Sequence, residues 1–125
     1  MKHSLLILAA AFILMAPKPV PATPDLALGD SDLVFGGEVT FVVTGLSAKQ
    51  SGQIDIQCYN DPYGWWDTKP VGSTFVLGSQ PTVAPPDMGS VIYLRWDGAP
   101  MDCTARLFTA NKKGVTVLDS LTFTV

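Results

Sequence analysis

The stretch Gln53-Ile54-Asp55-Ile56-Gln57-Cys58-Tyr59 alternates apolar and polar side chains with a period of two. Successive side chains of a β-strand point to opposite faces, so Ile54, Ile56 and Cys58 share one face and the polar residues between them share the other. Such alternation is typical of a strand with one buried face. The stretch therefore predicts a β-strand that turns its cysteine towards the core.

The same period recurs along the chain, between short clusters of Gly, Pro, Asp and Asn. The region after residue 22 contains no convincing helical pattern, and we count roughly seven to eight short strands. The clearer ones are at 38–44, 53–59, 91–96, 103–109 and 121–125, and the weaker ones at 26–35, 73–77 and 115–118. This pattern predicts an all-β fold, an Ig-like two-sheet antiparallel sandwich. A small β-barrel is the alternative, because alternation does not show whether a sheet closes.

The two cysteines of the chain, Cys58 and Cys103, both fall on the inward faces of their predicted strands. An even number of cysteines in an exported chain indicates a disulfide. Two free buried thiols are the alternative, whereas a cysteine metal site would lack its third and fourth soft ligands. Aspartates near 25–32 and 97–102 lack the EF-hand spacing, which leaves calcium bound between loops as the remaining metal alternative. We therefore predict a structural Cys58–Cys103 disulfide, with no metal site and no cofactor.

Residues 1–22 have the features of a secretory signal peptide. Lys2 and His3 form a short basic start, an apolar run follows, and Ala22 is a small residue at which signal peptidase would cut. The run is shorter than the roughly 20 apolar residues that span a bilayer, and prolines follow it. The chain is thus predicted to be secreted as one domain, residues 23–125, with no membrane span in its mature form. An uncleaved anchor or a buried terminal helix is the alternative.

The composition argues against several classes of function. The chain has 11 acidic and 8 basic residues, a formal charge of −3, and loss of Lys2 and Lys18 with the leader would lower this charge to −5. An acidic chain whose one basic pair is Lys112-Lys113 is a poor candidate for nucleic-acid binding. Its one histidine is His3, so the mature protein would have no imidazole for a Ser-His or Cys-His pair. We predict that the protein is not an enzyme.

The most unusual local feature is the stretch 59–67, in which two adjacent tryptophans follow a turn. Asn, Asp, Pro and Gly predict the turn, and the two tryptophans would point to opposite faces of the strand after it. Exposed Trp and Tyr side chains are common at binding hot spots. The alternative is that both indole rings close one end of the core. We take five residues as candidate contacts for a sugar ring or a protein partner: Tyr63, Trp65, Trp66, Asp61 and Asp67.

Four short motifs resemble small Ig-like domains encoded by actinobacteria and their phages: Gly37-Glu38-Val39-Thr40-Phe41, Ile54-Asp55-Ile56-Gln57-Cys58-Tyr59, Trp96-Asp97-Gly98 and Asp102-Cys103-Thr104-Ala105. The resemblance covers most of residues 33–125. It implies an exported Ig-like domain and adds little about activity, since most of these domains have no assigned function. The chain departs from the antibody-type pattern, because Cys58 is expected on the third strand. Its bridge would then join neighbouring strands of one sheet.

The sequence thus predicts a secreted or cell-envelope, non-enzymatic Ig-like binding module, whose partner is an unknown protein or a cell-surface glycan. One alternative is a carbohydrate-binding module that uses Tyr63, Trp65 and Trp66. A second alternative, which the resemblance raises, is a structural or decoration subunit at the surface of a phage virion.

Overall fold

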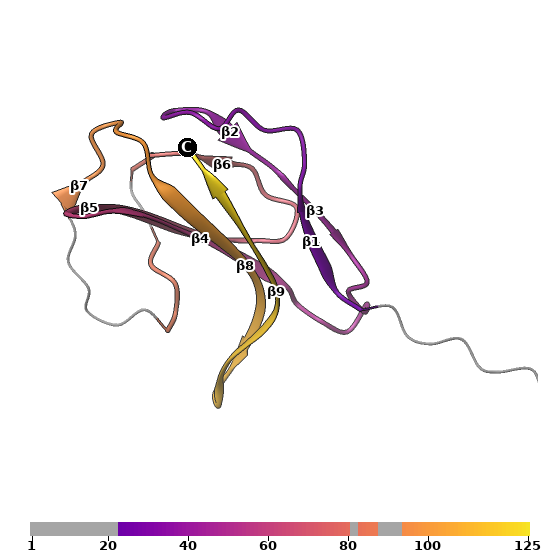
Figure 1. The fold of residues 1–125 in the computed structure, drawn as a ribbon. Coiled ribbons are helices and arrows are strands. Elements are labelled where there is room, and N and C mark those ends of the chain that lie inside the picture. The colour runs from indigo at the N-terminus through magenta and orange to yellow at the C-terminus, as the bar shows by residue number, and fades with distance from the viewer. Residues whose placement is uncertain (1–22, 81–82, 88–93) are drawn as a thin grey trace, which may run out of the picture.

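The computed structural model describes residues 23–80, 83–87 and 94–125, and this part of the chain contains strands and no helix (Figure 1). None of it therefore forms a helix that is long and apolar enough to cross a membrane. The predicted signal peptide, residues 1–22, lies outside the described residues. The strands are β1 (Asp25–Leu28), β2 (Glu38–Val39), β3 (Phe41–Thr44), β4 (Gln53–Asn60), β5 (Tyr63–Pro70), β6 (Phe75–Val76), β7 (Leu94–Arg95), β8 (Asp102–Asn111) and β9 (Gly114–Thr124).

The largest sheet has five strands in the order β7-β5-β4-β8-β9. β4 is its centre, since it pairs along nearly its whole length with β5 on one side and with β8 on the other. All neighbours in this sheet are antiparallel except β7, which pairs parallel to β5 over two residues. Two further two-stranded ribbons, β1–β3 and β2–β6, lie on one side of the sheet (Figure 1).

The hydrophobic core lies between the five-stranded sheet and the two ribbons. Leu26 of β1, Val39 of β2 and Phe75 of β6 are buried in one cluster with Ile54 and Ile56 of β4. The prediction of an all-β, mainly antiparallel domain is confirmed. The second layer, however, consists of two separate ribbons and not of one continuous sheet, and the described strands do not close into a barrel.

The predicted strand at 38–44 is divided because its two halves belong to different ribbons. β2 pairs with β6 and β3 pairs with β1, with Thr40 alone between them. The backbone N–H of Thr40 donates to Ser31 Oγ (3.1 Å), and its carbonyl accepts from the Gly29 N–H (2.8 Å). The chain thus crosses from one ribbon to the other while both backbone groups of Thr40 stay hydrogen-bonded.

The inward face of β4 is as the alternation predicts. Ile54, Ile56 and Cys58 are all buried in the core cluster. Cys58 lies directly opposite Cys103 on β8, with the two Cα atoms 4.0 Å apart, and the two residues form a disulfide. The disulfide prediction is confirmed, and so is the expectation that it joins neighbouring strands of one sheet.

Other strand predictions differ from the structure in extent. The patterns at 115–118 and 121–125 form one continuous strand, β9, because its register with β8 shifts at a bulge. Of the pattern at 26–35, only residues 26–28 lie in a strand, β1. Of the predicted strand at 91–96, residues 91–93 lie outside the described residues.

The outer face of the five-stranded sheet, the face turned away from the ribbons, differs from the expected polar surface. Asp55 lies on this face as predicted, in register with Thr68 on β5 and Arg106 on β8, yet its side chain has 0% exposure. Phe108 follows Arg106 on the same face and is also fully buried. The polar side of β4 is therefore closed to solvent at its centre.

Candidate functional site

All three tryptophans of the chain line one pocket at the β5–β7 end of the five-stranded sheet. This hollow, the tryptophan pocket, has a volume of about 250 Å³. Pockets for drug-sized ligands usually measure about 300–1,000 Å³, so this one suits a smaller group. The residues that line it are Gly64, Trp65, Trp66, Gly78, Gln80, Arg95 and Trp96.

The pairing of β5 with its neighbours brings these side chains together. Asp61 and Pro62 form a two-residue turn between β4 and β5, so the adjacent tryptophans enter the sheet directly after the hairpin. β7 then pairs parallel to β5, which sets Arg95 in register with Gly64 and brings Trp96 to the same end of the sheet. Because glycine has no side chain, the Gly64 position leaves room beside the arginine.

Two of the three indole rings form a fixed wall. Trp65 and Trp96 are only 3% and 4% exposed, and their ring centroids lie 6.2 Å apart. The Nε1–H of Trp65 donates to the Ser79 carbonyl (3.2 Å), and that of Trp96 donates to the Ala99 carbonyl (2.7 Å). Since both N–H groups are used inside the protein and both rings are almost wholly buried, the two rings form a fixed apolar base for the pocket.

The segment after β6 closes another side of the pocket through Gly78. This glycine has a φ of +80°, in the left-handed region that favours glycine. A Cβ atom at this position would lie 2.5 Å from the ring of Phe35, which in turn packs edge-on against Trp96 with ring centroids 5.0 Å apart. The close approach of backbone and ring holds this side of the pocket against the tryptophan wall.

The side chains at the accessible part of the pocket are less buried than the two tryptophans of the wall, and two of them are polar. Trp66 is half-buried, whereas Gln80 and Arg95 are exposed. No aspartate or glutamate is among the lining residues, and within the described part of the chain Arg95 forms no ion pair. The rim therefore combines one aromatic ring, one amide and one guanidinium, which can contact the flat face and the polar edge of the same small molecule.

The five candidate contacts that the sequence suggested do not lie together in the structure. Trp65 and Trp66 both line the pocket, and they differ in burial because successive strand residues point to opposite faces. Tyr63 is half-buried and packs against the core cluster. Asp61 is exposed at the hairpin turn and borders a different hollow, beside Asp102.

Asp67, the fifth candidate, has an internal role. Its side chain is buried on the same face of the sheet as Ile56. Oδ1 of Asp67 accepts hydrogen bonds from the backbone N–H groups of Thr68 (2.9 Å) and Val83 (3.3 Å). The carboxylate therefore holds the backbone of Val83 beside β5 by a hydrogen bond. Asp67 is not among the residues that line the tryptophan pocket.

The sequence prediction missed five residues of the pocket: Gly64 on β5 itself, and four residues of other segments, namely Gly78, Gln80, Arg95 and Trp96. The last four residues are far from β5 along the chain, and β7 pairs with β5 over only two residues. Nothing in the sequence pattern therefore indicates that they meet β5. The one available signal was compositional, since aromatic side chains bury large areas and pack favourably against one another. That signal would have linked Trp96 to the pair on β5, but not the arginine beside it.

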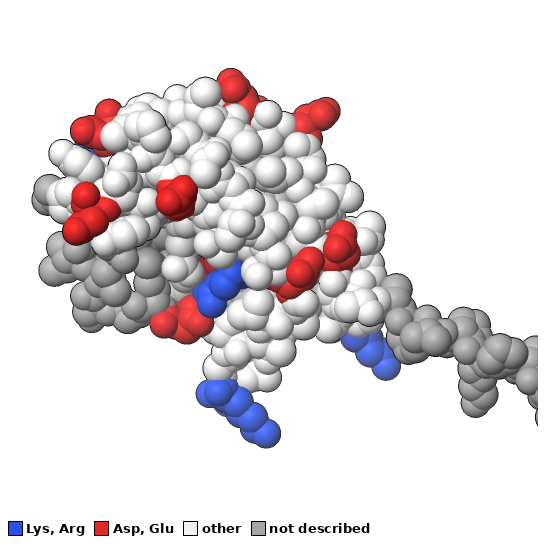
Figure 2. All heavy atoms as spheres, in the orientation of Figure 1, with Lys and Arg blue, Asp and Glu red and all other residues white. Residues whose placement is uncertain are grey.

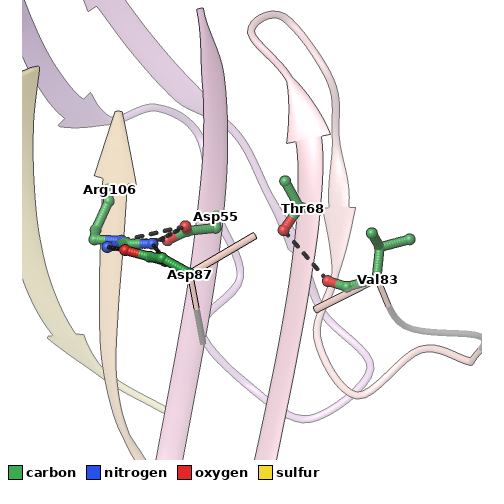
Figure 3. Close-up of polar contacts among 5 residues, drawn as sticks. All are labelled: Asp55, Thr68, Val83, Asp87 and Arg106. Atoms are coloured by element: carbon green, nitrogen blue, oxygen red, sulfur yellow. Dashed lines mark hydrogen bonds and ion pairs between the residues drawn. The ribbon is translucent and has the colours of Figure 1, made fainter. Parts of the chain in front are cut away.

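A second polar arrangement lies on the outer face and consists of Asp55, Arg106 and Asp87 (Figure 3). Arg106 donates from Nε (3.0 Å) and Nη2 (2.6 Å) to Asp55, and from Nη1 (3.0 Å) and Nη2 (2.6 Å) to Asp87. In the same view the Thr68 hydroxyl donates to the Val83 carbonyl (3.3 Å). The segment 83–87 is thus held against the sheet at both of its ends.

The electrostatics of this aspartate–arginine cluster follow from unequal burial. Burial raises the pKa of the Asp55 carboxyl, and the hydrogen bond from Arg106 opposes that rise. The hydrogen bond from Arg106 lowers the pKa of the more exposed Asp87 carboxyl, and the hydrogen bonds to Asp87 and Asp55 raise the pKa of Arg106. Because the two carboxylates occupy the guanidinium, we interpret the cluster as a structural connection and not as a ligand site.

Charge elsewhere is scattered. Figure 2 shows separate acidic side chains over the body of the domain and basic side chains at the end of the β8–β9 hairpin. The turn of that hairpin consists of Lys112 and Lys113, and both are exposed. Within the described residues, no group of three or more His, Cys, Asp or Glu side chains could hold a metal ion.

No protein-family model, curated protein or solved structure matches this chain. The structure itself defines a small all-β domain that contains one disulfide, Cys58–Cys103. Among the described residues, the tryptophan pocket brings all three tryptophans together with an amide and a guanidinium, so we take it as the candidate functional site.

Proposed function

We propose that this protein is an exported, non-enzymatic binding domain that holds one sugar ring of a surface glycan in the tryptophan pocket. The observation that carries the proposal is the convergence of all three tryptophans on one pocket, with Arg95 and Gln80 at its rim. The volume of about 250 Å³ supports a ligand group of the size of a single ring.

The chemistry of the rim supports a sugar over a purely apolar ligand. One face of a pyranose ring is lined by C–H groups and packs on aromatic rings, and the half-buried Trp66 is the aromatic side chain of the rim. The ring edge carries hydroxyl groups, to which Arg95 and Gln80 can donate hydrogen bonds. The buried Trp65 and Trp96 keep the pocket wall rigid, so little conformational freedom is lost when a ligand binds.

Two other observations support export and the absence of catalysis. A disulfide persists in an oxidising compartment, and residues 1–22 are predicted to be a signal peptide. The resemblance to Ig-like domains of actinobacteria and their phages supports a location at a cell or virion surface. The residues that line the pocket include no Asp, Glu, His, Cys or Ser, so they offer neither a nucleophile nor a general base.

Calorimetric titration of the full chain tests the proposal, with glucose, galactose, N-acetylglucosamine and galacturonate, each also as an oligosaccharide. We expect saturable binding to at least one sugar, and we expect Trp66→Ala to weaken it tenfold or more. Trp66→Phe keeps a flat ring and should retain part of the affinity. Val117→Ala, which removes an exposed apolar side chain on β9 that does not line the pocket, is the control and should bind like the wild type. Absence of binding to every sugar, or equal affinity of the wild type and Trp66→Ala, would overturn the proposal.

A further inference from the structure

The charges of the tryptophan pocket are the reverse of those of the whole chain. The chain carries 11 acidic and 8 basic residues, yet the pocket is lined by one arginine and by no acidic side chain. A neutral sugar needs no such arrangement, because hydroxyl groups bond equally well to carboxylates and amides. The local excess of positive charge indicates a ligand that carries negative charge at this position.

The two arginines of the chain, Arg95 and Arg106, differ in what surrounds them. The guanidinium of Arg106 is bound by two carboxylates, each at 2.6 Å from Nη2. Arg95 is exposed, lies in register with Gly64, and forms no ion pair with any described residue. Asp97, the nearest carboxylate along the chain, accepts a hydrogen bond from the Ala99 N–H at 3.0 Å. Among the described residues, no carboxylate therefore neutralises the charge of the exposed Arg95 side chain.

The geometry of a guanidinium selects among anions. Its planar N–H groups form two parallel hydrogen bonds with a carboxylate, and such charge-assisted bonds are roughly twice as strong as neutral ones. A uronic acid carries its carboxylate on the edge of the ring whose face would pack on Trp66. Gln80 at the same rim can bond a ring hydroxyl. One ligand can thus use the aromatic, cationic and amide groups together.

We infer that the sugar bound by the tryptophan pocket is acidic, with its ring carboxylate paired to Arg95. This inference rests on the proposed function and deepens it by naming the class of glycan. It assigns to Arg95 the selection of charged over neutral sugars, and to Trp66 the general affinity for a sugar ring.

The test compares two ligands that differ only at the carboxyl group, oligogalacturonate and its uncharged methyl ester, each titrated into the full chain. We expect the wild type to bind the acid at least tenfold more tightly than the ester, and Arg95→Gln to lose this preference. Arg95→Lys keeps the positive charge but lacks the planar guanidinium, so its preference for the acid should lie between those of the wild type and Arg95→Gln. Lys112→Gln, which removes an exposed cation at the hairpin turn, should keep the full preference.

Three outcomes overturn the inference in different ways. If the wild type binds acid and ester equally while Trp66→Ala weakens both, the ligand is not selected by charge and the proposed function stands. If neither acid, ester nor neutral sugar binds, the proposed function fails and the inference fails with it. A preference for the acid that Arg95→Gln retains would assign the selection to another residue.

Discussion

Arg106→Met would leave the Asp55 carboxyl in the outer face of the sheet without its main partner. The side chain of Asp55 has 0% exposure, and Arg106 binds it through both Nε and Nη2. Removal of one member of a buried ion pair costs about 3–5 kcal/mol. The side chain of Arg106 retains 17% exposure, so water can reach the vacated site and the lower end, about 3 kcal/mol, is the expected loss. Domains of this size have a total stability of about 5–15 kcal/mol, so the change is easily measured.

The loss should depend on pH in a definite direction. Burial raises the pKa of Asp55 above its ordinary value, and removal of Arg106 raises it further. A carboxyl group whose pKa is higher in the folded than in the unfolded protein destabilises the fold as pH rises through that interval. The difference in stability between wild type and Arg106→Met should therefore be largest near neutral pH, and it should narrow towards the ordinary aspartate pKa of about 3.9.

Urea unfolding of the full chain, followed by circular dichroism, measures both effects. Asp87→Asn is the matched control, because Asp87 binds the same guanidinium but its side chain is 45% exposed, and its loss should be about 0–1 kcal/mol. The double variant Asp55→Val/Arg106→Met should recover part of the loss, since no charge is then buried. The reasoning is refuted if Arg106→Met costs no more than Asp87→Asn, or if its cost does not change with pH.

Two further predictions concern the stability contributed by the disulfide and by the glycine at position 78. Replacement of both Cys58 and Cys103 by alanine opens a loop with a sequence separation of 45, and the loop-entropy relation gives a loss of about 4 kcal/mol; urea unfolding checks this value, and a loss below about 1 kcal/mol would contradict it. Gly78→Ala should lower stability more than Gly36→Ala, because both glycines have positive φ but only the Cβ at Gly78 would strike the ring of Phe35. Equal thermal shifts for the two alanine variants would show that this contact is unimportant.

The residues that could be predicted from the sequence are those whose environment is set by their own strand. The alternation around Cys58 gives its inward direction, the pairing of an even number of cysteines gives the bridge to Cys103, and both are observed.

What escaped prediction depends on contacts between distant segments. Alternation assigns Asp55 to the outer face, but it does not show that Arg106 and Asp87 close over it, since Asp87 belongs to a segment outside the sheet. The strand is divided at Thr40 because its two halves pair with different ribbons. The two halves share the same alternating pattern, so the sequence does not show the division. Likewise, the tryptophan pocket needs the pairing of Gly64 with Arg95, which involves too few residues to leave a periodic signal.

The most direct test of the proposed function uses the intrinsic fluorescence of the tryptophans, because all three line the pocket. The measurement is the emission of the full chain during titration with oligogalacturonate, in wild type and in Trp66→Ala. A bound sugar should change the emission of the wild type saturably, and Trp66→Ala should need at least tenfold more ligand for half of its own change. An emission spectrum that stays constant through the titration of the folded wild type, with this acid and with the neutral oligosaccharides, would contradict the assignment of the pocket as a sugar site.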